Sequence, residues 1–177
     1  MRVKRNVVGA VSAAAMLVIA GCAGKPEPAA PTSTFVLPSV AASLTPAVYM
    51  SLASTSSLFA IKASELALER STSGSTRSAA QAIIADQGGV GSQLSYAGRR
   101  LDLLPNAALT DAQAADLERL RQSVNFDSDY RKLVGDTLAH AWEAHRNFAA
   151  AGSSPTLRPV AQMAAPVTKK DVDALRR

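Results

Sequence analysis

The apolar residues of segment 126–152 recur at spacings of three and four, which is the period of an amphipathic helix. This segment also holds the only Trp and both His of the chain. Such a helix is stable only when other elements cover its apolar stripe, because helical propensity alone leaves it marginal in water. The pattern therefore predicts a helical bundle built around this segment. The stripe consists of Phe126, Tyr130, Leu133, Val134, Thr137, Leu138, Ala141, His145 and Phe148.

Further segments with a helical period flank the central one. Thr45-Pro46 combines an N-cap residue with proline at the first helical position, and predicts a helix to about residue 71 with Val48 on its apolar stripe. A second helix is expected over about 76–104. The sequence from Thr110 to Gln113 resembles a capping box and predicts a short helix before the central one. The last helix is expected to begin at Ser154-Pro155.

Glycine and proline are expected to interrupt two of these helices. Gly88, Gly89 and Gly91 each cost about 1 kcal/mol relative to alanine inside a helix, so a kink or weak point is predicted there. Pro166 removes a backbone donor and should bend or break the last helix.

The composition favours helices over sheets. Alanine and leucine supply most of the apolar content, whereas aromatic residues, which strands favour, make up only 5% of the chain. A chain of 177 residues with 19% charged residues is sufficient for one compact domain. We therefore predict an all-α fold over residues 45–177, an antiparallel four-helix bundle with an extra short helix before the third long helix.

Residues 1–21 have the features of a signal peptide. Basic residues precede an apolar run of about 14 residues, which is too short for a membrane span of about 20 residues. The run ends at Ile19-Ala20-Gly21-Cys22, which resembles the lipobox of bacterial lipoproteins, in which the cysteine is acylated after cleavage before it. The alternative is an ordinary signal peptide with a chance cysteine. Because Cys22 is the only cysteine, an intramolecular disulfide is excluded.

Residues 22–44 are expected to form a tether between the lipid and the bundle. Several prolines disfavour regular helix and favour extended conformations, which would reach roughly 60 Å. The sequence leaves open whether the apolar residues 35–37 dock on the bundle. By resemblance to Gram-negative lipoproteins, Ala23 in place of aspartate after Cys22 favours the outer membrane, with the protein facing the periplasm.

The positive charge does not indicate a nucleic-acid partner. Removal of Arg2, Lys4 and Arg5 with the signal peptide lowers the formal net charge from +5 to +2. No basic cluster interleaved with aromatic residues follows. A solvated surface is therefore the favoured interpretation.

A set of landmark residues occurs along the chain in a recognisable order: Glu65, Asp86, Leu104-Pro105, Phe126-Asp127, Tyr130, Gly152-Ser153-Ser154-Pro155 and Ala165-Pro166. Through these residues the chain resembles the DUF4142 family of exported bacterial proteins over roughly residues 45–176. The family is of undefined function, and the resemblance implies a ferritin-like helical bundle. Its members typically carry a Glu on the first helix and three His on the later helices. The His positions are Gln87, Leu138 and Asp171 here, so any role of those His cannot be transferred.

Candidate chemistry in the sequence is sparse. No Glu-x-x-His motif occurs, although di-iron bundles use it to place two ligands on one helix face. The spacing of Asp136 and His140 fits a chance ion pair better than a chelating pair. We therefore expect no catalytic residue, no metal site and no cofactor. Four side chains could converge as a relic polar site in the bundle interior: Glu65, Gln87, His145 and Asp171.

These observations favour a non-enzymatic role in the cell envelope. We expect a lipoprotein anchored to the membrane through Cys22, whose bundle binds an envelope protein or serves a structural purpose. The alternative is a metal-handling or redox bundle of ferritin-like ancestry. The sequence leaves the oligomeric state and the partner open.

Overall fold

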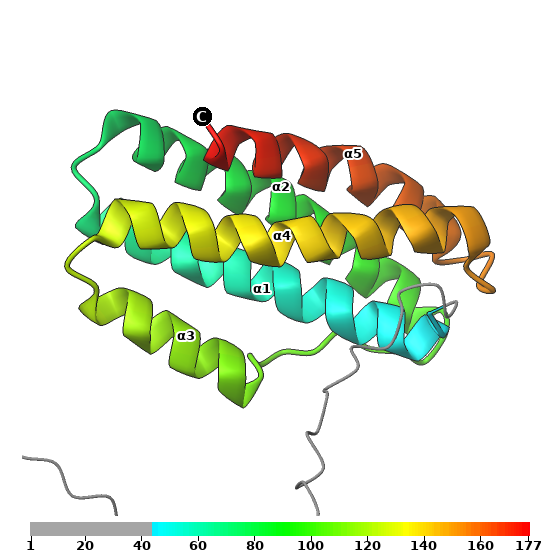
Figure 1. The fold of residues 1–177 in the computed structure, drawn as a ribbon. Helices are drawn as coiled ribbons and strands as arrows, with labels where there is room; N and C mark the ends of the chain where they lie inside the picture. The colour runs from blue at the N-terminus through cyan, green and yellow to red at the C-terminus, as the bar shows by residue number, and fades with distance from the viewer. Residues whose placement is uncertain (1–43) are drawn as a thin grey trace, which may run out of the picture. The chain divides into compact units, whose positions relative to one another are not determined.

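The computed structural model describes residues 44–177, which form five α-helices and no strand (Figure 1). The predicted all-helical fold is therefore confirmed. The predictions about the signal peptide, Cys22 and the tether up to residue 43 concern residues outside the described range. The helices are α1 (Pro46–Arg70), α2 (Gly74–Arg99), α3 (Asp111–Gln122), α4 (Phe126–Ala151) and α5 (Arg158–Leu175).

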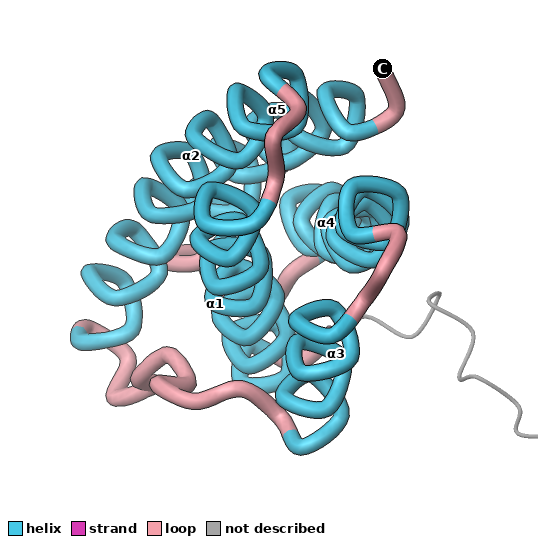
Figure 2. Tube along the Cα trace, turned by 90° about the vertical axis from the view of Figure 1, so that its left-hand side faces the viewer, coloured by secondary structure: helices cyan, strands magenta, loops and turns pink. Residues whose placement is uncertain are grey.

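The four long helices form an antiparallel bundle, and α3 is the predicted extra short helix. Going around the bundle, α1 contacts α2, α2 contacts α5, α5 contacts α4 and α4 contacts α1. Helices α2 and α4 therefore lie on a diagonal, and the connection that contains α3 crosses between them. Figure 2 shows α3 beside α1 and α4. A single long crossover is typical of ferritin-like bundles.

We call the end of the bundle at which α1 begins the proximal end, and the opposite end the distal end. At the distal end, arginines hold the C-terminal ends of other helices, where backbone carbonyls lack helical partners. Arg70 donates to Leu120 O of α3 at 3.1 Å, and Arg131 donates to Leu175 O of α5 at 3.3 Å. These contacts attach α3 to the bundle and join α4 to α5.

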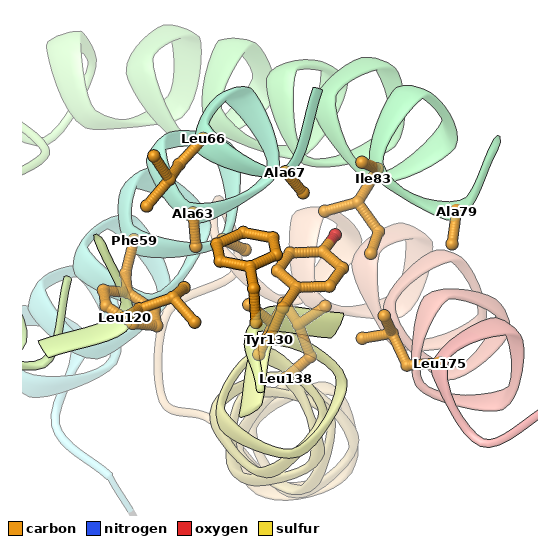
Figure 3. Packing of buried hydrophobic residues seen from close by; sticks show 14 of the residues in the cluster. Phe59, Ala63, Leu66, Ala67, Ala79, Ile83, Leu120, Tyr130, Leu138 and Leu175 are labelled. Carbon is orange, nitrogen blue, oxygen red and sulfur yellow. The ribbon is translucent and has the colours of Figure 1, made fainter. Parts of the chain in front are cut away.

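The core consists of two apolar clusters, one toward each end. Figure 3 shows the distal cluster, in which side chains of all five helices meet. The largest side chains of the distal cluster are Phe59, Leu66, Ile83, Leu120, Phe126, Tyr130, Leu138 and Leu175. Those of the proximal cluster are Tyr49, Met50, Val90, Leu94, Phe148, Leu157 and Val160.

Neither α2 nor α5 is broken at the positions where the sequence predicted a weak point, a bend or a break. Helix α2 is continuous through Gly88, Gly89 and Gly91, because Gln87 and Val90 hold its inner face in the core. A Cβ atom at any of the three glycines would meet nothing within 4 Å, so they lie on an open outer face. Helix α5 continues through Pro166, which is exposed.

The predicted end of the second helix is also wrong, because α2 ends at Arg99 rather than at residue 104. Leu103 N donates to Gly98 O at 3.0 Å, and Asp102 has a left-handed backbone with φ of 54°. This is the hydrogen bond and conformation of a Schellman motif, which usually places glycine where Asp102 stands. Local backbone bonds at the C-terminus therefore end the helix before Pro105 can.

Side-chain caps mark the starts of α1, α2 and α3, whereas α4 and α5 begin without one. Thr45 and Thr110 cap α1 and α3, and the capping box with Gln113 is confirmed. Ser154 Oγ accepts from Leu157 N at 3.2 Å, but the residues after it form a turn and α5 begins only at Arg158. On α1, Val48 is 51% exposed and is not part of the buried stripe, contrary to the prediction.

Candidate functional site

A buried polar layer separates the two apolar clusters. Ser57 Oγ of α1 donates to Gln87 Oε1 of α2 at 2.9 Å. Gln87 Nε2 donates to Asp171 Oδ2 of α5 at 2.8 Å and lies 3.4 Å from Thr168 Oγ1. All four residues are buried, so these bonds satisfy polar groups that water cannot reach. The layer joins α1, α2 and α5 at mid-height of the bundle.

The carboxyl group of Asp171 is the least satisfied member of this layer. Its Oδ1 atom is buried and has no hydrogen-bond partner among the described residues. Burial, and to a lesser extent the neighbouring Asp86 carboxylate, raise the pKa of Asp171 to about 7, although the bond from Gln87 and the charge of Lys170 oppose the shift. Lys170 forms an ion pair with Asp86 at the surface above it. Asp171 therefore titrates near neutral pH.

His145 belongs to a second polar pair in the proximal half. Its Nδ1 atom lies 2.9 Å from the hydroxyl of Tyr49, and its Nε2 atom is buried without a partner in the described residues. The Tyr49 ring stacks on Phe148 at a centroid distance of 4.1 Å. Burial lowers the pKa of His145 to about 4 and raises that of Tyr49, so both side chains are neutral at physiological pH.

The four predicted site residues do not converge. Gln87 and Asp171 are hydrogen-bonded to each other, whereas His145 pairs with Tyr49 instead. Glu65 is exposed, beside Lys62 of α1 and the α3 residues Leu117 and Arg121. Its neighbour Ser64 points inward instead and bonds to the Tyr130 hydroxyl at 2.8 Å.

Sequence reasoning missed the α1 partner of the layer. Ser57 and Ser64 are seven residues apart, and Ala53, Ala60 and Ala67 complete a buried stripe of small residues at helical spacing. That periodicity, rather than side-chain chemistry, was the available signal. Serine is often exposed, so its place on the inner face was not apparent.

Two other candidates differ from their expected roles. Asp136 is paired with Lys132 at 2.7 Å rather than with His140, which is exposed, so the predicted pair is wrong. Within residues 44–177, no three His, Cys, Asp or Glu side chains are grouped so that they could hold a metal ion. Beside the polar layer, two potential metal ligands lie close together, the carboxylates of Asp86 and Asp171, and two are fewer than such a group requires.

A surface cleft lies over the polar layer, between α1 and α2. Its volume is about 480 Å³, and it extends from Ile61 to the loop at Asn106, with Gln87 at its base. Serines of both helices and the half-buried Gly88 and Gly91 of α2 line it. Gln87 presents no free donor there, because its Nε2 group donates to Asp171 and Thr168.

The chain matches a known family over most of its length. Residues 33–177 match the family model described as "Domain of unknown function (DUF4142)", a range that includes all five helices. No curated protein and no solved structure matches the chain. The resemblance seen in the sequence is confirmed, and the match begins upstream of the first helix.

Proposed function

Because the chain belongs to the DUF4142 family, a domain of unknown function, its role has to be inferred from its own residues, and we propose a lipid-anchored protein of the cell envelope. In this proposal the folded body is an interaction module that acts through its surface, and Cys22 carries the lipid. The protein faces the periplasm from the outer membrane and is not an enzyme.

The observation that carries the interaction role is the engagement of the interior polar groups with one another. Ser57, Gln87 and Asp171 form one hydrogen-bonded chain, and Tyr49 and His145 form another. Each of these side chains is at most 3% exposed, and burial keeps the imidazole neutral. These groups are therefore shielded from solvent and bonded mainly to one another, which favours a function located on the outer faces of the helices.

The proposed anchor rests on the sequence around Cys22. Several acyl chains, at about 0.8 kcal/mol per buried CH₂ group, hold a protein far more firmly than a single chain does. In residues 44–177 no helix is long and apolar enough to cross a bilayer. A partner is expected among envelope proteins, which an anchored bundle meets in the plane of the membrane.

Photo-crosslinking in intact cells tests the interaction role. A crosslinking amino acid would be placed singly at Glu65, at Gln81 on the outer face of α2 and at Val124 in the loop after α3, all of which are exposed. The proposal predicts one discrete adduct with an envelope protein from one of these faces, and none from the others. Diffuse adducts of equal yield from all positions, or none from any, would contradict it.

Metal handling is the second candidate, and one observation favours it. The buried Asp171 Oδ1 lacks a partner and lies beside the Asp86 carboxylate, an arrangement that a hard cation would neutralise. Calorimetric titration with Mn²⁺, Fe²⁺ and Zn²⁺ distinguishes the two roles. Stoichiometric binding that is lost in Asp171→Asn and kept in Glu65→Gln would establish this candidate, because Glu65 is remote from the layer and serves as the control.

A further inference from the structure

The net charge of the described residues is concentrated in the proximal half of the bundle. With the polar layer as the boundary, residues 59–87, 109–141 and 168–177 contain eleven basic and eleven acidic side chains. Residues 44–58, 88–108 and 142–167 contain four arginines and two acids. The distal half is thus balanced, and the proximal half carries the whole excess of positive charge.

The proximal arginines have no acidic partners in the described residues. All five ion pairs of residues 44–177 lie in the distal half, where they involve α2, α3, α4 and α5. Arg99, Arg100 and Arg158 are exposed and take part in none of them. Their charges are therefore available to a partner.

Exposed apolar side chains are concentrated at the same end. Three of the four large exposed hydrophobic residues are proximal: Val48 is 51% exposed, Tyr96 58% and Leu104 68%. They come from the start of α1, the last turns of α2 and the loop after α2, and Figure 1 shows these segments together with the start of α5. The fourth, Val124, is 94% exposed at the distal end.

We propose that the proximal end docks on an anionic lipid surface, through a surface formed by Val48, Tyr96, Arg99, Arg100, Leu104 and Arg158. This inference rests on the proposed lipid anchor. The chain enters α1 at the proximal end, so a lipid on Cys22 is connected to that end and not to the distal one. Arginine pairs with anionic headgroups, and tyrosine favours the membrane–water interface.

The tether makes a weak interaction sufficient. Residues 23–43 cannot reach further than about 70 Å even when fully extended. A bundle confined within this distance of the membrane has an effective concentration at the lipid surface in the millimolar range. Each arginine near an anionic surface increases binding on the order of fivefold, so three of them increase it on the order of a hundredfold. The tether and the three arginines therefore both favour docking of the anchored bundle.

Fluorescent labels at the two ends of the anchored protein test the proposal. The acylated full chain is reconstituted in vesicles of phosphatidylcholine, with or without one quarter of phosphatidylglycerol. An environment-sensitive fluorophore is attached to Leu104→Cys or, as the matched control, to Val124→Cys. With phosphatidylglycerol, emission at position 104 should shift to the blue and become protected from an aqueous quencher, whereas position 124 should remain accessible.

Charge variants provide the second readout. Replacement of Arg99, Arg100 and Arg158 by Gln should reduce the protection at position 104 by a factor of ten or more. The same replacement of the distal, exposed Arg119 and Arg121 should leave the protection unchanged. Equal accessibility at positions 104 and 124 in anionic vesicles would overturn the proposal, and so would protection that appears only after envelope proteins are added.

Mass spectrometry of the same preparation separates the two hypotheses. It reports whether Cys22 carries acyl chains, independently of the fluorescence. An acylated chain with an accessible position 104 means that docking fails while the anchor stands. A chain without acyl groups means that the anchor fails.

Discussion

Replacement of Asp171 by Asn should stabilise the protein at neutral and alkaline pH. The side chain is 1% exposed, and burial raises its pKa to about 7. Asparagine has nearly the same shape and keeps an oxygen that can accept the bond from Gln87 Nε2. The substitution thus removes a charge that the interior disfavours and retains the packing.

The magnitude follows from the difference between the folded and unfolded pKa values. The folded protein holds the proton of Asp171 more tightly than the unfolded chain does, so stability falls as the pH rises from about 4 to about 7. One pKa unit corresponds to about 1.4 kcal/mol, and the shift of about three units sets an upper limit near 4 kcal/mol. Because Lys170 and Asp86 can rearrange around the ionised group, we expect a stabilisation of roughly 2 to 3 kcal/mol.

His145 has the opposite effect on the pH dependence. Its pKa is lowered from 6.5 to about 4, so the unfolded chain binds the proton more tightly and stability is lost as the pH falls from 6.5 toward 4. In the parent protein the loss of stability that Asp171 causes with rising pH and the gain that His145 causes largely cancel between about pH 4 and 6.5. In Asp171→Asn only the His145 slope remains, so stability should rise with pH between about 4 and 6.5.

Urea denaturation followed by circular dichroism, at pH values across this range and above 7, measures both effects. Asp136→Asn is the control, because Asp136 is an exposed carboxylate paired with Lys132 and its loss should change stability little. If Asp171→Asn is less stable than the parent above pH 7, or if the two pH profiles are parallel, the reasoning about the buried carboxyl group is refuted.

Four further substitutions test the packing by denaturation. Gly98→Ala should destabilise the protein by more than 1 kcal/mol, because a Cβ atom there would lie 2.3 Å from Leu103 O. Gly88→Ala on the same helix should stabilise the protein by about 1 kcal/mol, because a Cβ atom there meets nothing. Equal effects of the two substitutions would contradict this reasoning. Leu138→Asp should cost several kcal/mol by burying an unpaired charge, and an unchanged melting temperature would show that Leu138 faces solvent. Tyr49→Phe should cost about 1 to 3 kcal/mol, since it leaves Nδ1 of the buried His145 without a partner, and a neutral effect would argue against that bond.

The bundle could be predicted from the sequence because its signals are local. The stripe of the 126–152 segment, the cap at Thr45 and the capping box at Thr110 each act within a few residues, and each appears in the structure. Neither Gly88 nor Pro166 breaks its helix, because tertiary packing of the inner helix faces outweighs a local cost of about 1 to 3 kcal/mol.

The candidate site was predicted only in part, for a geometric reason. Gln87 and Asp171 stood out because each is a polar residue on an apolar stripe, and the structure joins them. Their partner Ser57 and the pairing of His145 with Tyr49 depend on the relative rotation and height of different helices. Glu65 illustrates the same limit. It is adjacent to Ser64 in α1, and adjacent residues of a helix point in different directions, so Ser64 is buried and Glu65 is exposed.

The central claim is that a lipid on Cys22 holds this bundle at the membrane, and labelling of cells with radioactive palmitate tests it most directly. The parent chain should incorporate label and sediment with membranes after cell fractionation. Cys22→Ser, which removes the only thiol of the chain, should incorporate none. A Cys22→Ser chain that still incorporates palmitate, or a parent chain that incorporates none, would contradict the account.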